Sequence, residues 1–227
     1  MNLAIITGAS SGLGREYARI VAEKYPQLDE ILLIARRRER LEELALAFPN
    51  RRVHVLPLDL TAPNSMDVID RWLTERGARV GLLINNAGMG VLGNVADSTP
   101  ETQGHMVDLN CRALVMLTTL CLKYMDRGAV IVNVCSIASF VPNPRLNTNS
   151  ATKAFVLSFT KGLRYELKPR GVNALAVCPA PMNTEFLPVA GIGQGASHTF
   201  DVLPRVKPPV VAERSLRAAF RGRCVYT

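Results

Sequence analysis

The chain has 227 residues, of which 48% are hydrophobic and 20% charged, and its formal net charge at pH 7 is +8. This length suits one large α/β domain with a substantial core. No apolar run reaches the ~18 residues of a membrane span, and the chain enters its first strand at once, so we expect neither a span nor a signal peptide. No nucleic-acid motif accompanies the arginine clusters, so we expect no nucleic-acid partner.

Short apolar segments alternate with amphipathic segments along the chain. We expect strands near residues 2–6, 30–35, 52–56, 81–84, 128–134, 172–177 and 223–227. We expect helices near residues 12–25, 37–47, 64–76, 100–126, 148–168 and 208–220. Continuous apolar runs such as Ile31–Ile34 indicate strands buried on both faces. The alternation predicts a single doubly wound α/β domain over residues 1–227, with a parallel sheet and helices on both faces.

Two segments depart from this regular alternation. Residues 179–209 are rich in proline and glycine and include the run Gly191–Gly195, which predicts a mobile substrate lid. The last residues, Arg221–Thr227, resemble a turn followed by a strand that is cut at residue 227. We therefore expect either a truncated chain or a missing tail at this end.

The cysteines bear on redox chemistry and metal binding. Five cysteines are scattered without paired spacing and lie mostly in apolar stretches, namely Cys111, Cys121, Cys135, Cys178 and Cys224. This usage predicts buried free thiols in a reducing compartment, so we expect a cytoplasmic protein. We expect no metal site.

A glycine-rich segment, Thr7–Gly14, joins the first strand to the first helix. Gly8 permits a tight turn, and Gly12 and Gly14 permit close approach of a pyrophosphate and of the helix to the sheet. The amides at the helix N-terminus would face the phosphates. This position predicts a dinucleotide-binding loop, and the alternative is a purely structural glycine turn. The loop residues assigned to the cofactor are Gly8, Ser10, Ser11, Gly12, Leu13 and Gly14.

The glycine spacing is G-x-x-x-G-x-G, and with it the chain resembles the short-chain dehydrogenase/reductase family. The resemblance covers essentially the whole chain and extends in order to Asp59–Leu60, Asn85–Gly88, Asn110, Ser136 and Lys153. It implies a Rossmann-type fold that binds a nicotinamide dinucleotide. It also implies reversible hydride transfer between that cofactor and a ketone or secondary alcohol.

The end of the second strand bears on the choice between NAD and NADP. An NAD site requires a carboxylate there, whereas a positive residue suits the 2′-phosphate of NADP. Arg36 occupies this place, so we expect NADP(H), with Ser10 and Arg37 as helpers. The alternative is that Arg36 and Arg37 are ordinary solvated arginines at the start of a helix.

Further residues are expected to contact the cofactor. Asp59 could accept a hydrogen bond from the adenine amine, or it could cap a helix together with Thr61. The resemblance implies that Thr184 holds the nicotinamide carboxamide, in a loop where Ala180 replaces the family's usual glycine. The other positions assigned to the cofactor are Leu60, Asn86, Ala87, Gly88, Lys153 and Pro179, and Asn86 is expected to be structural rather than catalytic.

The resemblance also assigns catalytic roles. Ser136 would donate a hydrogen bond to the substrate oxygen, and Ser139 would support the pocket. Lys153 would bind the nicotinamide ribose and lower the pKa of a neighbouring phenol. Asn110 lies inside an apolar helix, where an amide without a partner is costly. The resemblance implies that Asn110 bends this helix and holds a water on the proton-relay path.

The position of the family's catalytic tyrosine falls four residues before Lys153, and this chain has Asn149 there. Residues i and i+4 share a helix face, so Asn149 should point into the site beside Lys153. An asparagine amide forms hydrogen bonds but has no proton to release near neutral pH. Three interpretations remain open: an engineered substitution, a natural non-catalytic protein that binds cofactor or partner, and slow chemistry through Asn149 and water.

Substrate and assembly are less strongly indicated. Residues 179–209 carry few charges, which favours a hydrophobic ketone such as a steroid or an acyl chain. The helices at 100–126 and 148–168 are more apolar than one sheet face requires, and the resemblance implies that they pair between subunits. We therefore expect a homodimer or homotetramer, unless these residues simply pack on the sheet. The rival function is that of a cofactor-binding or scaffold protein without catalysis.

Overall fold

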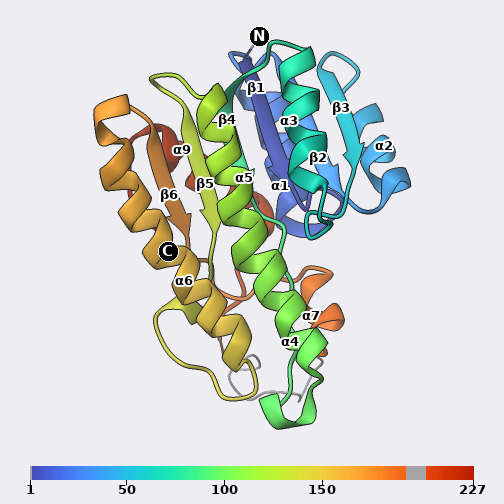
Figure 1. Cartoon of the computed structure of the whole chain (residues 1–227), viewed down its shortest axis with the longest axis vertical. Coiled ribbons are helices and arrows are strands. Elements are labelled where there is room, and N and C mark those ends of the chain that lie inside the picture. The colour runs from blue at the N-terminus through green and yellow to red at the C-terminus, as the bar shows by residue number, and fades with distance from the viewer. Residues whose placement is uncertain (1, 193–202) are drawn as a thin grey trace.

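In the computed structural model, which describes residues 2–192 and 203–227, seven parallel strands form one sheet in the order β3-β2-β1-β4-β5-β6-β7 (Figure 1). The strands are β1 (Asn2–Thr7), β2 (Glu30–Ala35), β3 (Arg52–Pro57), β4 (Arg79–Asn85), β5 (Val130–Val134), β6 (Asn173–Val177) and β7 (Val225–Tyr226). Every strand pair is parallel, which confirms the predicted doubly wound sheet. The strand order reverses between β1 and β4, and this reversal opens a crevice at the carboxyl ends of the strands.

Helices cover both faces of the sheet (Figure 1). One face packs against α1 (Gly12–Lys24), α2 (Arg38–Leu46) and α9 (Pro208–Phe220). The other packs against α3 (Ser65–Glu75), α5 (Ala113–Cys121) and α6 (Asn147–Leu167), and α4 (Pro100–Val107) continues the line of α5 beyond the sheet. A short helix, α7 (Phe186–Val189), lies below the carboxyl ends of the strands.

Alternation along β1 explains why the sheet is apolar on both faces. Ala4 and Ile6 join the core cluster under α1 and α9, while Leu3 and Ile5 join the cluster under α3, α5 and α6. All four side chains are 0% exposed. The continuous apolar run is thus required by burial on two sides at once.

A chain of buried polar side chains ties the second half of the sheet to its helices. Asn85 Nδ2 on β4 donates to Thr118 Oγ1 on α5 and to Asn133 Oδ1 on β5, each at 2.9 Å. Asn133 Nδ2 donates in turn to Thr160 Oγ1 on α6 at 2.9 Å. Because each of these groups is desolvated, the loss of one would leave its partners unsatisfied. These hydrogen bonds therefore fix β4 and β5 against α5 and α6.

The expected strands and helices are all present in the described residues, with three refinements. The predicted helix 100–126 is divided by a π-helical turn at Asp108–Arg112 between α4 and α5. The described part of 179–209 includes α7 and a β-bridge between Met182 and Val206, neither of which was expected from the sequence. Residues 193–202 of the expected lid, including most of its glycine run, lie outside the described residues.

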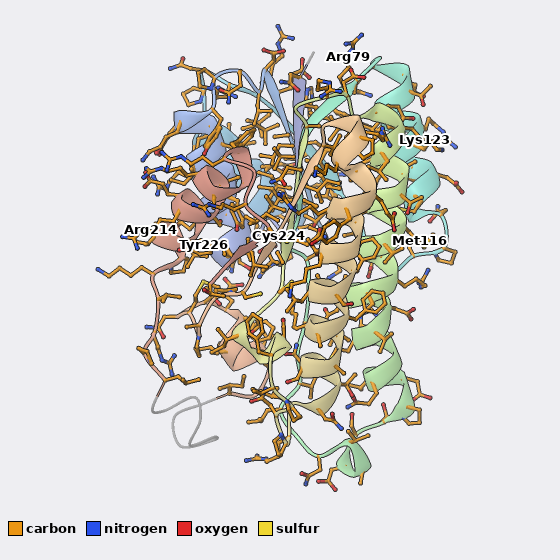
Figure 2. All side chains as sticks on the ribbon, turned by 90° about the vertical axis from the view of Figure 1, so that its left-hand side faces the viewer. Arg79, Met116, Lys123, Arg214, Cys224 and Tyr226 are labelled. Carbon is orange, nitrogen blue, oxygen red and sulfur yellow. The ribbon has the colours of Figure 1, made fainter. Side chains whose placement is uncertain are left out.

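The strand β7 forms one edge of the sheet, between the two helix layers. It is joined to its neighbour β6 by two backbone hydrogen bonds. Ala176 N donates to Cys224 O at 2.9 Å, and Cys178 N donates to Tyr226 O at 2.7 Å. Figure 2 shows Cys224 and Tyr226 between the layers, with Arg214 on the outer side of α9.

One helical stretch within the described residues, Pro100–Tyr124, has the length and apolar composition of a membrane-crossing helix. Half of its most apolar window is buried inside the protein, as in the core helix of a globular domain. Met116 points outward from this stretch in Figure 2, whereas Leu114 and Leu117 are buried. This stretch is therefore weak evidence for a membrane span.

Candidate active site

A cavity of about 830 Å³ lies at the carboxyl ends of the strands. It is lined by the glycine loop, by the ends of β2, β4 and β5, and by the segment that leads into α7. The structure brings almost all of the predicted site residues to this cavity, namely Gly8, Ser10, Ser11, Gly12, Leu13, Arg36, Asp59, Leu60, Asn86, Ala87, Gly88, Ser136, Asn149, Lys153, Pro179 and Thr184. Gly14 and Asn110 lie behind the lining and support it.

The glycine loop is packed too closely for side chains. Gly8 and Gly12 have φ of +63° and +53°, which L side chains rarely adopt. A Cβ on Gly14 would lie 2.3 Å from the carbonyl oxygen of Gly8. Asn86 Nδ2 donates to Thr7 O at 3.0 Å and to Gly8 O at 3.2 Å, so Asn86 fixes the loop from the neighbouring strand.

The end of the cavity beyond β2, where the sequence predicts the adenosine of a dinucleotide (the adenosine end), combines basic and acidic groups. Arg37 donates to Ser10 Oγ from Nη2 at 3.0 Å and from Nε at 3.3 Å. Asp59 Oδ1 accepts from Thr61 N at 2.9 Å and from Thr61 Oγ1 at 2.7 Å. Burial would raise the pKa of Asp59, but these hydrogen bonds and the nearby Arg36 hold it below its ordinary value. Asp59 thus closes a turn with Thr61 and does not cap a helix, because α3 begins only at Ser65 with Asn64 as its N-cap. The carboxylate stays on the cavity wall.

Asn110 holds the backbone of Met89 from inside the π-helical turn. Its Oδ1 accepts from Met89 N at 2.9 Å, and its Nδ2 donates to Met89 O at 2.9 Å. The same Nδ2 donates to Thr152 Oγ1 on α6 at 3.0 Å. The extra residue of the π turn marks the place where this helix departs from regular geometry, as the bend expected at Asn110 requires.

Asn149 points to the same backbone. Its Nδ2 donates to Met89 O at 3.0 Å, and its own carbonyl accepts from Thr152 Oγ1 at 2.7 Å. The residue is only 6% exposed. A Cβ on Gly90 would come within 2.9 Å of Asn149 Nδ2 and 2.8 Å of Phe186 Cζ, so a side chain at this position would force one of these groups to shift.

Lys153 lies one helical turn after Asn149 and is also buried. Its Nζ donates to Val134 O at the end of β5 at 3.0 Å. Burial lowers the pKa of Lys153, and the thiols of Cys135, Cys111 and Cys178 oppose this shift. The neutral form of the amine is therefore reached more easily than in water.

Ser136 and Ser139 belong to the turn after β5. Ser136 Oγ accepts from Ala138 N at 3.1 Å, and its hydroxyl hydrogen remains able to donate into the cavity. Ser139 Oγ donates to the backbone oxygen of Lys153 at 3.0 Å, so it joins this turn to α6. The five cysteines are free, and four of them are buried, as the sequence analysis predicted.

Comparison with known proteins agrees with this arrangement. Residues 2–191 match the family described as short chain dehydrogenase. The chain belongs to the short-chain dehydrogenase family. Its relatives include sulfoacetaldehyde reductase 2 of Chromohalobacter salexigens, which is 37% identical over 93% of this chain and 84% of the relative.

Solved structures of family members superpose on nearly the whole chain. A short-chain dehydrogenase from Sphingobium yanoikuyae in complex with NADPH has a TM-score of 0.86 at 32% identity, covering 99% of this chain and 87% of that one. A bulky-bulky ketone specific alcohol dehydrogenase from Comamonas testosteroni has a TM-score of 0.81 at 28% identity, covering 99% and 85%. This chain is therefore an oxidoreductase of a family that binds NAD(P), which confirms the family and the cofactor type expected from the sequence.

Sequence reasoning missed several residues of this short-chain dehydrogenase site. Met89 is held by two asparagines through its backbone, which no side-chain pattern reveals. Glu185 forms ion pairs with Arg37 and Arg40, from a segment that lies far from them in the sequence. Phe186 closes the substrate side of the cavity against Gly90. The only signal for the last two was their place in the expected lid.

Gly14→Ala tests the packing of the loop. The added Cβ would meet the backbone of Gly8, which cannot move aside like a flexible side chain, so we expect a loss of about 1–3 kcal/mol in unfolding free energy and weaker dinucleotide binding. Urea unfolding and calorimetric titration measure the two effects. The matched control is Gly104→Ala on α4, where a Cβ meets nothing within 4 Å and should stabilise the helix by about 0.5–1 kcal/mol. Equal behaviour of the two variants would contradict the packing argument.

Proposed function

We propose that this short-chain dehydrogenase uses NADP(H) to interconvert a ketone and a secondary alcohol, and that Asn149 impairs the chain as written. One observation carries the proposal: the glycine loop, Ser136, Asn149 and Lys153 line the same cavity. The alternative is a protein of the same fold that binds the cofactor without catalysis.

The residues present fit a bound dinucleotide. Gly8, Gly12 and Gly14 form a cradle that side chains would fill, at the N-terminus of α1, where backbone amides favour phosphate. Arg36 and Arg37 line the adenosine end together with Ser10, which supports NADP(H) over NAD(H). Asp59, Leu60, Ala87 and Gly88 would lie along the adenine and its ribose, and Pro179 and Thr184 along the nicotinamide.

The cofactor supplies the hydride, and the chain must orient the substrate and provide a proton. The Ser136 hydroxyl would donate to the carbonyl oxygen of the ketone and stabilise its developing negative charge. Lys153 would hold the nicotinamide ribose with its ammonium group. Asn110, bound to Met89 and Thr152, would keep the relay water in place next to Lys153.

Asn149 leaves this arrangement without a general acid at position 149. Its amide cannot release a proton near neutral pH, so it cannot serve as the general acid. It donates instead to Met89 O, as a structural group would. This geometry is compatible with all three interpretations of Asn149: an engineered substitution, a natural non-catalytic protein, and slow chemistry through Asn149 and water. The variant Asn149→Tyr separates the first two.

The substrate end of the cavity favours an apolar ligand. Its wall there is formed largely by Phe140, Val141, Leu146, Phe186, Val189 and Leu203. We therefore propose a hydrophobic ketone, in line with the bulky ketone specificity named for one structural neighbour. Sulfoacetaldehyde is the second candidate, because two relatives at 37% and 36% identity are named as its reductases. A substrate panel must therefore contain both classes.

The first functional prediction concerns the cofactor. NADPH should bind about ten- to a hundredfold more tightly than NADH, since a charge-assisted contact to phosphate contributes about 1.5–3 kcal/mol. Arg36→Ala should reduce this preference, and Arg38→Ala, whose side chain pairs with Glu42, is the matched control. Calorimetric titration decides the matter. Equal affinities for the two nucleotides, or no loss of NADPH binding in Arg36→Ala, would refute the assignment.

The second concerns residue 149. Asn149→Tyr should raise reductase activity by about 10²–10⁴-fold, the usual contribution of a positioned general acid. NADPH affinity should stay nearly constant, because the glycine loop and the arginines carry it. The assay follows NADPH oxidation at matched stability, with bulky ketones and sulfoacetaldehyde as substrates.

Two outcomes of that assay would contradict the proposal. A tyrosine variant that binds NADPH but stays inactive on every substrate would favour the non-catalytic alternative. An asparagine form that already turns over at an ordinary rate would show that the proton comes from another group.

The third concerns assembly. We propose a homodimer or homotetramer through the outer faces of α4, α5 and α6, where Val107, Met116 and Phe155 are 45%, 38% and 46% exposed. Phe155 also stacks on the partly buried Phe159, with ring centroids 6.2 Å apart. Phe155→Asp should weaken association, whereas Leu46→Asp on α2 should not. Light scattering that finds a monomer at micromolar concentration would rule the proposal out.

A further inference from the structure

An ion-pair cluster closes the adenosine end of the cavity. Arg37 Nη1 donates to Glu185 Oε2 at 2.9 Å, and Arg40 Nη1 donates to Glu185 Oε1 at 2.6 Å. Both carboxylate oxygens are thus held by guanidinium groups. These hydrogen bonds hold the pKa of Glu185 below its ordinary value, so the carboxylate is charged at neutral pH.

This carboxylate stands at a place that suits another anion. The Arg37 guanidinium that holds it also donates to Ser10 Oγ in the glycine loop, and Ser10, Arg37 and Glu185 all line the cavity. Arg37 comes two residues after the end of β2, where the proposed function locates the 2′-phosphate of the cofactor, and its hydrogen bonds bring Ser10 and Glu185 to the same place. A carboxylate that bridges two guanidinium groups offers them negatively charged acceptor oxygens, as a phosphate would, although it carries less charge and one oxygen fewer.

We propose that Glu185 is an internal competitor for the 2′-phosphate and thereby sets the discrimination between NADPH and NADH. The inference rests on the proposed function, which supplies the phosphorylated cofactor. Glu185 belongs to the segment leading into α7, not to the dinucleotide-binding half of the sheet. Preference for the cofactor is therefore controlled in part from the substrate side of the site.

The ion pairs of Glu185 are weak enough for the 2′-phosphate to replace its carboxylate on the two arginines. Arg37, Arg40 and Glu185 have side chains that are 44%, 45% and 42% exposed, and ion pairs this open to water contribute little. A phosphate monoester carries more than one negative charge near pH 7 and has three acceptor oxygens. The phosphate can therefore displace the carboxylate, but part of its binding free energy is used to do so. NADH, which has no 2′-phosphate, encounters no such competition.

Replacement of the Glu185 carboxylate by the 2′-phosphate would also affect the substrate end of the cavity. Glu185 lies between Thr184, which contacts the Gly12 position of the glycine loop, and Phe186, which packs against Gly90. Release of Glu185 from Arg37 and Arg40 would free this segment from the adenosine end. The two ends of the cavity are thus linked through three consecutive residues.

The test is the ratio of NADPH to NADH affinity, measured by calorimetry. Glu185→Gln removes the competing charge and should tighten NADPH binding about three- to tenfold, while NADH binding changes less than about twofold. The matched control is Glu42→Gln, which removes the same charge from α2 but pairs only with Arg38 among the described ion pairs. The control should leave the ratio unchanged. In an Arg37→Gln background the gain from Glu185→Gln should largely disappear.

The outcomes distinguish this inference from the proposed function. Weaker NADPH binding in Glu185→Gln would mean that the carboxylate organises the arginines for phosphate, and it would overturn the inference. An unchanged ratio, or an equal gain in Glu42→Gln, would overturn it as well. In all these cases NADPH still binds and the proposed function stands. Loss of dinucleotide binding in every form, the parent chain included, would overturn both.

Discussion

The two-way hydrogen bonding between Asn110 and the backbone of Met89 is the contact on which the substrate side of the site depends. One amide donates to the carbonyl and accepts from the N–H of the same residue, which fixes both the position and the rotation of that peptide segment. Asn110 makes this contact from within the π turn at Asp108–Arg112. Asn149 then meets the carbonyl that Asn110 has fixed. Gly90 comes next in the chain, and a side chain there would force Asn149 or Phe186 to shift.

This arrangement explains how the fold accommodates an asparagine at the position where the proposed function requires a proton donor. The Asn149 side chain is buried, and its Nδ2 donates to Met89 O. An amide held in this way stabilises the site geometry but has no proton to transfer near neutral pH. In the proposed function, cofactor binding and proton transfer therefore depend on different parts of the chain: most residues that would cradle the dinucleotide follow β1, β2 and β4, whereas position 149 lies on α6. A protein of this kind can keep the cofactor site intact whether or not it turns over substrate.

The parts that could be predicted from sequence are those set by local pattern. Continuous apolar runs identified the strands because both faces of the sheet are buried, and the spacing of Gly8, Gly12 and Gly14 identified the loop because backbone contacts exclude side chains there. Other features depend on contacts between distant segments. The partners of Glu185 lie in α2 and just before it, and α7 is too short for a periodic signal. The π turn was foreseen only as a bend, since a single additional residue barely disturbs the apolar period of a long helix.

That additional residue has a consequence for how the chain tolerates changes in length. A π turn is equivalent to one extra residue inserted into a regular α-helix. When one residue of the turn is deleted, α4 and α5 can therefore form a regular helix along the same axis. A deletion within Asp108–Arg112 would thus convert α4 and α5 into one regular helix whose packing on the sheet is largely preserved. What would be lost is the pair of hydrogen bonds that Asn110 makes with Met89 from the π turn. Within one continuous helix, a single position can be dispensable for folding and indispensable for shaping the cavity.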